Sequence, residues 1–332
     1  MSKRKVTEAM AKLLVDSASS NPQVATAAQA QLAVALTEPL RSGVMAGDII
    51  GDIFETIDLQ PGIPAEFPLD TLDAAGVKDF VAYTMPHHGY IPQRDVSADS
   101  VLVRTYEIGS SVDWLLRIAR YTRWDLVTRN MQRLESSFTK KRNDDGWHIL
   151  LQSGASHSSL VYDGAATAGL FTKRLVSMLK TRMRRGAGGN STSINRGKLT
   201  DLYISPEAEE DIRNWGVDQL DEITRHQIYN APDGKIQRIF QVNLHDIDEL
   251  GINQEYQNYF LDEIGGSFPA SKVELVVGLD LESNDAFVMP EAEPITIEPD
   301  PTLRRQRREG FYGWAEQGFG CLDARRVILG AF

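Results

Sequence analysis

The sequence has very little of what disulfide frameworks, thiolate metal sites and membrane spans require. Its 332 residues include one cysteine, Cys321, which excludes an internal disulfide and a zinc site built from several thiolates. Low cysteine usage is typical of a reducing compartment. No apolar run approaches the roughly 20 residues that a membrane-spanning helix needs, and residues 1–20 lack the apolar stretch of a signal peptide. With 42% hydrophobic and 24% charged residues, the chain is predicted to fold as a soluble protein of one large or two moderate domains.

Motifs for catalysis and nucleotide binding are also lacking. The sequence contains no GxSxG nucleophile elbow, no HExxH zinc motif and no dinucleotide-type GxGxxG. The glycine-rich run "RRGAGGNSTSINRGKLT" does not match a phosphate-binding loop, because Thr192 stands where its first glycine belongs and Leu199 stands where a hydroxyl residue belongs. The run also precedes a predicted strand, whereas a phosphate-binding loop follows one.

Two short patterns remain as candidates for chemistry. His87 and His88 are adjacent, so on an extended chain their side chains point to opposite faces, and a shared metal would need further ligands. We therefore interpret them as turn or interface residues. Ser177 and Lys180 have the Ser-x-x-Lys spacing of some acyl-transfer enzymes, but arginines crowd the same helix and no companion motif follows. The sequence thus predicts no catalytic residue, no metal site and no cofactor.

The charge is distributed unevenly. The net charge is −11, yet residues 201–300 carry 23 acidic and 5 basic side chains, and residues 104–198 carry 17 basic and 7 acidic side chains. Oppositely charged sections can steer copies of one chain together and fix their register. A difference in surface composition between two subdomains is the alternative interpretation.

Local patterns in the first two thirds predict an ordered series of elements. Residues 5–36 have apolar residues at helical spacing, and Asn21-Pro22 divides them into two short helices. Residues 43–110 are rich in proline and short β-type runs, which indicates an extended two-stranded loop. Residues 111–154 predict a helix pair or one spine-like helix, with Ser110 or Ser111 as the N-cap of the stretch and Gly154 as its C-terminal cap. Within it, a second helical pattern runs from Trp124 to Leu151. Residues 170–185 predict a basic amphipathic helix.

The last third reads as strands with one clear helix boundary. Residues 199–204 form a predicted strand, after which Ser205 is a helix N-cap, Pro206 the first helical residue and Gly216 the end of the helix. Residues 235–300 alternate short strands with turns. The chain ends in "REGFYGWAEQGFGCLDARRVILG" (308–330), whose glycines and aromatics predict a strand that packs closely in a sheet.

Three segments, taken in order, resemble the major capsid proteins of tailed double-stranded DNA bacteriophages, the Hong Kong 97-type fold. They are "FVAYTMPHHGYIPQRDVSADSVLVRTYEIGSSVDWLLRIARYTRWD" (80–125), "LYISPEAEEDIRNW" (202–215) and "GFYGWAEQGFGCLDARRVILG" (310–330). The resemblance implies an α+β phage major capsid fold. Its parts would be an N-terminal arm (1–42), an extended β-hairpin loop (43–110), a peripheral domain with a long spine helix (111–198), an axial domain (199–300) and a C-terminal return to the peripheral domain (301–332).

The resemblance also implies a function in assembly. Copies of the chain would form hexamers and pentamers of an icosahedral shell that encloses packaged double-stranded DNA without sequence-specific binding. The partners would include scaffold, portal and decoration proteins but no membrane, and the shell would assemble in the host bacterial cytoplasm and become the virion capsid. The residues expected to contact neighbouring subunits lie in the loop and in the arginine cluster near the end: His87, His88, Tyr90, Arg94, Arg304, Arg305, Arg307 and Arg308. Two alternatives stay open, an encapsulin-like nanocompartment shell and, more distantly, a soluble serine hydrolase that uses Ser177 and Lys180.

Overall fold

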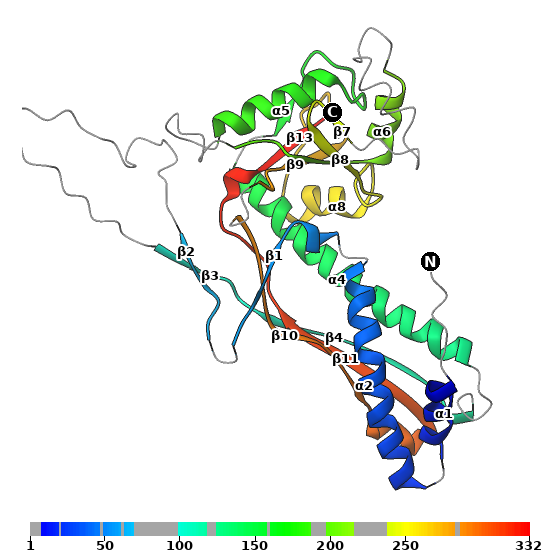
Figure 1. Cartoon of the computed structure of the whole chain (residues 1–332). Helices are drawn as coiled ribbons and strands as arrows, with labels where there is room; N and C mark the ends of the chain where they lie inside the picture. The colour runs from blue at the N-terminus through cyan, green and yellow to red at the C-terminus, as the bar shows by residue number, and fades with distance from the viewer. Residues whose placement is uncertain are drawn as a thin grey trace, which may run out of the picture. The chain divides into compact units, whose positions relative to one another are not determined.

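The computed structural model of the chain describes ten stretches of sequence that form two compact units (Figure 1). The described residues are 8–19, 21–46, 49–60, 63–69, 99–117, 124–157, 160–186, 197–215, 238–282 and 286–332. Unit 1 draws on residues 1–65, 103–146 and 288–319, and unit 2 draws on residues 66–102, 147–287 and 320–332. Each unit is therefore assembled from segments that lie far apart in the sequence.

Unit 1 is a sheet with helices packed along it. Its strands follow the order β1-β10-β11-β4, in which β1 is parallel to β10 and the other neighbours are antiparallel. The bounds of its elements are α1 (Glu8–Ser17), α2 (Pro22–Ala46), η1 (Ile50–Asp52), β1 (Glu55–Asp58), β4 (Tyr106–Leu115), the first part of α4 (Trp124–His157), most of β10 (Phe287–Pro299), η5 (Pro301–Gln306) and β11 (Arg308–Gln317).

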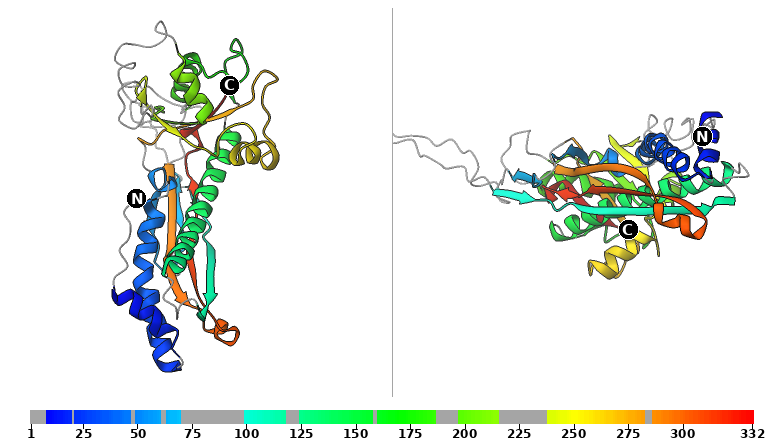
Figure 2. Two further views of the ribbon diagram at one scale, coloured as in Figure 1. Left: turned by 90° about the vertical axis from the view of Figure 1, so that its right-hand side faces the viewer. Right: turned by 90° about the horizontal axis from the view of Figure 1, so that it is seen from below.

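One hydrophobic cluster holds unit 1 together. It joins Leu32 and Leu40 of α2, Phe138 of α4 and Phe311 of β11, all of which are buried. Burying an aliphatic or aromatic side chain of this size contributes about 1.5–3 kcal/mol. Figures 1 and 2 both show α2 running along the sheet, so this N-terminal helix is part of the core of unit 1.

Unit 2 is built on a six-stranded sheet in the order β5-β13-β9-β6-β8-β7. It also contains the two-stranded antiparallel sheet of β2 and β3. The bounds of its elements are β2 (Glu66–Leu69), β3 (Asp99–Leu102), the end of α4, β5 (Val161–Tyr162), α5 (Lys173–Gly186), β6 (Asp201–Ile204), α6 (Pro206–Arg213), β7 (Arg238–Ile239), β8 (Val242–Asp246), α8 (Glu255–Asn258), η3 (Tyr259–Glu263), β9 (Leu275–Leu279), β12 (Gly320–Cys321), η6 (Ala324–Arg326) and β13 (Val327–Ala331).

The predicted boundaries that depend on local sequence are confirmed. The α1–α2 break falls at Asn21-Pro22, and the Asn21 side chain accepts a hydrogen bond from the backbone N–H of Gln23 at 3.1 Å. The second helix was predicted to be short, but α2 has 25 residues and runs to Ala46. At the start of α6, the Ser205 hydroxyl accepts from the backbone N–H of Ala208 at 3.2 Å, and Pro206 is the first helical residue. Gly216 lies outside the described residues.

The long helix is one spine-like element that begins where the second helical pattern was predicted, but the predicted caps were wrong. α4 has 34 residues and begins at Trp124. The range from Tyr106 to Leu115, where Ser110 or Ser111 was expected to cap the helix, is instead the strand β4, paired along its whole length with β11. Gly154 is not a cap but lies inside the helix, where an added Cβ would approach Leu329 Cγ to 2.8 Å. Close packing, not termination, explains this glycine.

The C-terminal run 308–330 contains strands of two different sheets, so the expectation of a single closing strand was wrong. β11 lies between β10 and β4 in unit 1, and β13 lies between β5 and β9 in unit 2. The predicted close packing of the glycines is confirmed. A Cβ on Gly313 would come within 3.0 Å of the Phe138 ring, and one on Gly318 would lie 2.6 Å from the backbone oxygen of Arg104.

The range predicted as an extended loop, 43–110, contributes at both ends to unit 1. β1 pairs with β10, and the first residues of β4 pair with β11. Between these ends, β2 and β3 form the predicted two-stranded pairing, with Leu69 opposite Asp99. How the residues divide between a peripheral and an axial domain stays a prediction.

Candidate subunit-contact surfaces

The β2–β3 ribbon is the part of the predicted loop that forms a separate two-stranded sheet. It pairs with no other strand among the described residues, and Leu102 keeps 54% of its surface exposed. A two-stranded ribbon is marginally stable by itself in water, because it has almost no core of its own. The loop residues expected to contact neighbours, His87, His88, Tyr90 and Arg94, lie outside the described residues.

The arginine cluster lies at the connection between β10 and β11. Arg305 and Arg307 are exposed, and Arg307 has a backbone φ of 56°, in the left-handed region that non-glycine residues rarely adopt. Arg308 begins β11 and forms an ion pair with Asp113 of β4, so its charge is partly neutralised within unit 1. Arg304 lies in η5, and its side chain is outside the described part of the chain. The expectation that this cluster contacts a neighbouring subunit stays a prediction.

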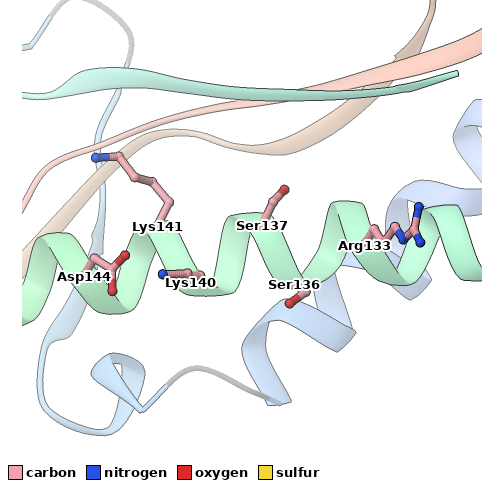
Figure 3. Close-up of a pocket in the computed structure, with 6 residues that line it drawn as sticks. All are labelled: Arg133, Ser136, Ser137, Lys140, Lys141 and Asp144. Carbon is pink, nitrogen blue, oxygen red and sulfur yellow. The ribbon is translucent and has the colours of Figure 1, made fainter. Parts of the chain in front are cut away.

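A shallow depression of about 400 Å³ lies along α4, and no sequence motif predicted it. Figure 3 shows its six lining side chains, all from α4: Arg133, Ser136, Ser137, Lys140, Lys141 and Asp144. They recur every three or four residues, so they share one broad face of the helix. Such a polar helical face is common, which is why spacing alone does not identify it as a site.

One edge of this depression is fixed by contacts between α4 and β4. Ser137 Oγ lies 3.0 Å from Ser110 Oγ. Asp145 accepts hydrogen bonds from Lys141 Nζ at 2.8 Å and from the Tyr106 hydroxyl at 2.6 Å. Burial, the hydrogen bond to Asp145 and the charge of that carboxylate raise the pKa of Tyr106, so its hydroxyl is a hydrogen-bond donor at neutral pH. The lining of the depression thus combines cations, hydroxyls and the Asp144 carboxylate.

Ser177 and Lys180, the residues of the hydrolase alternative, lie on α5 as predicted. The Lys180 amine donates to the backbone oxygen of Phe240 at 2.7 Å, in the turn between β7 and β8. That turn has φ values of 49° at Phe240 and 65° at Gln241, so a lysine bond to it supports an unfavourable backbone conformation. This contact gives Lys180 a structural role.

Within the described residues no group of three or more His, Cys, Asp or Glu side chains could hold a metal ion. In the same part of the chain, no helix is both long and apolar enough to cross a membrane.

Burial, opposed by a hydrogen bond with Ser153, raises the pKa of Cys321 to about 11, so its thiol is protonated at neutral pH.

Comparison with known proteins gives a result at the level of structure. No protein-family profile and no curated protein matches the sequence. Solved capsid structures do match. The capsid protein of the cyanophage P-SCSP1u is 10% identical, with 86% of this chain and 88% of that chain covered and a TM-score of 0.57. The subunit of the bacteriophage PhiM1 mature capsid is 10% identical, with 86% of each chain covered and a TM-score of 0.55. The capsid subunit of an empty GTA particle is 11% identical, with coverage of 86% and 90% and a TM-score of 0.56. This chain therefore has the α+β fold of phage capsid subunits, as the sequence resemblance implied.

Proposed function

We propose that this chain is a major capsid protein that self-assembles, through hexamers and pentamers, into the icosahedral shell enclosing packaged phage double-stranded DNA. The observation that carries the proposal is the fold, which is shared with phage capsid subunits over 86% of the chain. The proposed role is structural and not enzymatic. The proposed location is the virion capsid, assembled in the host bacterial cytoplasm.

Features of the two units support a role in assembly. The β2–β3 ribbon has no core of its own among the described residues, as expected of an element that is completed by a neighbouring copy. The net charge of −11 disfavours tight binding of nucleic acid, which suits a container from which DNA must leave. Scaffold, portal and decoration proteins are the further partners we propose.

The proposal is tested by expressing the full chain and observing its association. We expect sedimentation velocity to show concentration-dependent capsomers or shells, and negative-stain micrographs to show closed icosahedral particles. A compact monomer at every concentration, even with a scaffold protein supplied, would contradict the proposal.

The contents of native particles separate this function from the alternatives. A phage shell yields double-stranded DNA on extraction, whereas a nanocompartment yields a protein cargo and no genome. If the chain were a serine hydrolase, Ser177→Ala would abolish an esterase activity of the purified chain. We expect Ser177→Ala to have no effect on esterase activity.

A further inference from the structure

The two faces of the six-stranded sheet in unit 2 are covered by different elements. On one face, Leu175 of α5 packs in the same hydrophobic cluster as Leu202 of β6. On the other face, Tyr203 of β6 contacts Trp147 of α4, which stacks on Tyr256 of α8 with 5.5 Å between ring centroids. Because neighbouring side chains of a strand point to opposite faces, α5 and α8 lie on opposite sides of the sheet, as Figure 1 also shows.

Helix α5 is strongly cationic, whereas α6, which packs in the same hydrophobic cluster, carries four carboxylates. The 14 residues of α5 include six lysines and arginines and no acidic residue. Arg174 lies 3.6 Å from Asp163, and Lys180 donates to the backbone oxygen of Phe240. The remaining four cations are exposed, and within the described chain none forms an ion pair: Lys173, Arg182, Arg184 and Arg185.

The α8 side of the sheet is strongly acidic. No lysine or arginine occurs between Arg238 and Lys272, and the segment 246–263, which includes α8 and η3, carries six carboxylates. Four of the six are exposed and form no ion pair with any cation that the structure describes: Asp248, Glu249, Asp262 and Glu263. Each side of unit 2 therefore has exposed charge that its own described residues do not neutralise.

We propose that the cationic face of α5 in one copy binds the acidic 246–263 face of the next copy. This inference rests on the proposed function and assigns it a contact surface. Since the two surfaces differ and lie on opposite sides of one unit, the contact is head to tail and repeats from copy to copy, as in a ring. Contact between two α5 faces would oppose like charges. A nucleic acid would neutralise α5 alone, whereas a second copy neutralises both faces.

Paired charge reversals test the contact in the full chain. The first variant is Arg184→Glu with Arg185→Glu, and the second is Asp262→Lys with Glu263→Lys. All four positions are exposed, so both variants should unfold at the wild-type temperature. We expect each variant alone to associate at least about tenfold more weakly than wild type by sedimentation velocity, because like charges then face each other. An equimolar mixture of the two variants should restore association, since every contact in an alternating ring is again between opposite charges. The four substitutions combined in one chain should restore it as well.

The outcomes separate this inference from the proposed function. If the wild-type chain never associates, the proposed function fails. If wild type associates and the α5 variant associates equally well, or if the mixture does not restore association, the inference is overturned and the proposed function stands. The matched control for the α5 variant is Lys12→Glu with Arg104→Glu, which lowers the net charge by the same amount at exposed positions of unit 1. Equal weakening by the control overturns the inference, because net charge would then explain the effect. If the α5 variant no longer binds a short DNA duplex but associates as wild type does, α5 is a nucleic-acid surface, and the inference is again overturned.

Discussion

Individual buried polar residues set how stability depends on pH, and Glu274 is the clearest case. Burial raises the pKa of this carboxyl above its ordinary value of 4.5, and the charges of Glu207 and Asp211 add to the effect. The hydrogen bond that the Ser205 hydroxyl donates to it, at 2.8 Å, acts in the opposite direction. The ionised form is thus less favourable in the folded protein than in the unfolded chain, and folding stability falls as the pH rises through the ordinary value.

Glu274→Gln should therefore be more stable than wild type at pH 7, and the difference should shrink as the pH falls towards 4.5, where the carboxyl becomes protonated. The glutamine oxygen can still accept from Ser205. Urea unfolding of both proteins between pH 4 and pH 8 measures the difference, with the exposed Glu263→Gln as the control for the loss of a charge. A stability difference that does not change with pH would contradict this explanation.

Gly318 is a residue at which a side chain would meet the backbone of another segment of the chain. A Cβ at this position would lie 2.6 Å from a backbone oxygen, that of Arg104, and backbone cannot rotate away as a side chain can. We expect Gly318→Ala to destabilise the protein by about 1–3 kcal/mol. Gly186→Ala, where no heavy atom lies within 4 Å of the added Cβ, should be neutral in the same thermal unfolding experiment. Equal effects of the two substitutions would show that close approach at Gly318 does not limit stability.

At the scale of elements, α4 contributes to two separate cores. Phe138 is 2% exposed within the cluster of unit 1, and Trp147 is fully buried against Tyr203 in unit 2. Replacing either aromatic residue with alanine should cost about 3–5 kcal/mol. Hydrogen exchange should locate the two losses differently, with faster exchange in β4 and β11 for Phe138→Ala and in β6 and α8 for Trp147→Ala. Equal loss of protection in both units from either substitution would contradict the assignment of separate cores.

Elements that are decided locally could be predicted from the sequence, and those decided by distant partners could not. Ser205 and Pro206 define the start of α6 within a few residues, so the prediction held. The second half of β4, from Ser111 to Leu115, was predicted as a helix start because its strand conformation depends on pairing with Arg308–Tyr312, far along the chain. The depression on α4 could not be predicted for the same reason, since its edge depends on contacts with Ser110 and Tyr106 of β4. The cationic helix α5 was found because six basic residues in one amphipathic segment are visible without any partner.

At the scale of the whole molecule, the order of segments carried more information than any single motif. The resemblance predicted the α+β capsid fold, and the structural comparisons confirm it. The predicted domains were continuous ranges with boundaries at residues 111, 199 and 301, whereas each compact unit is built from three separate segments. The C-terminal run shows why, because β11 and β13 are neighbours in the sequence and belong to different sheets.

The predicted loop has a consequence for the whole molecule that a deletion tests. If residues 84–95 serve neighbouring subunits and not the subunit's own core, deleting them should leave a chain with the wild-type circular dichroism spectrum and unfolding temperature. If the loop contacts neighbouring subunits through His87, His88, Tyr90 and Arg94, the same deletion should abolish shell formation. Replacing the twelve residues with a Gly-Ser linker of equal length keeps the reach of the chain but removes these side chains. Failure of both variants to assemble would assign the contact to the side chains, whereas assembly of the linker variant alone would assign it to loop length. A deletion variant that does not fold would show that the segment belongs to the subunit's own core, and the loop assignment would then be wrong.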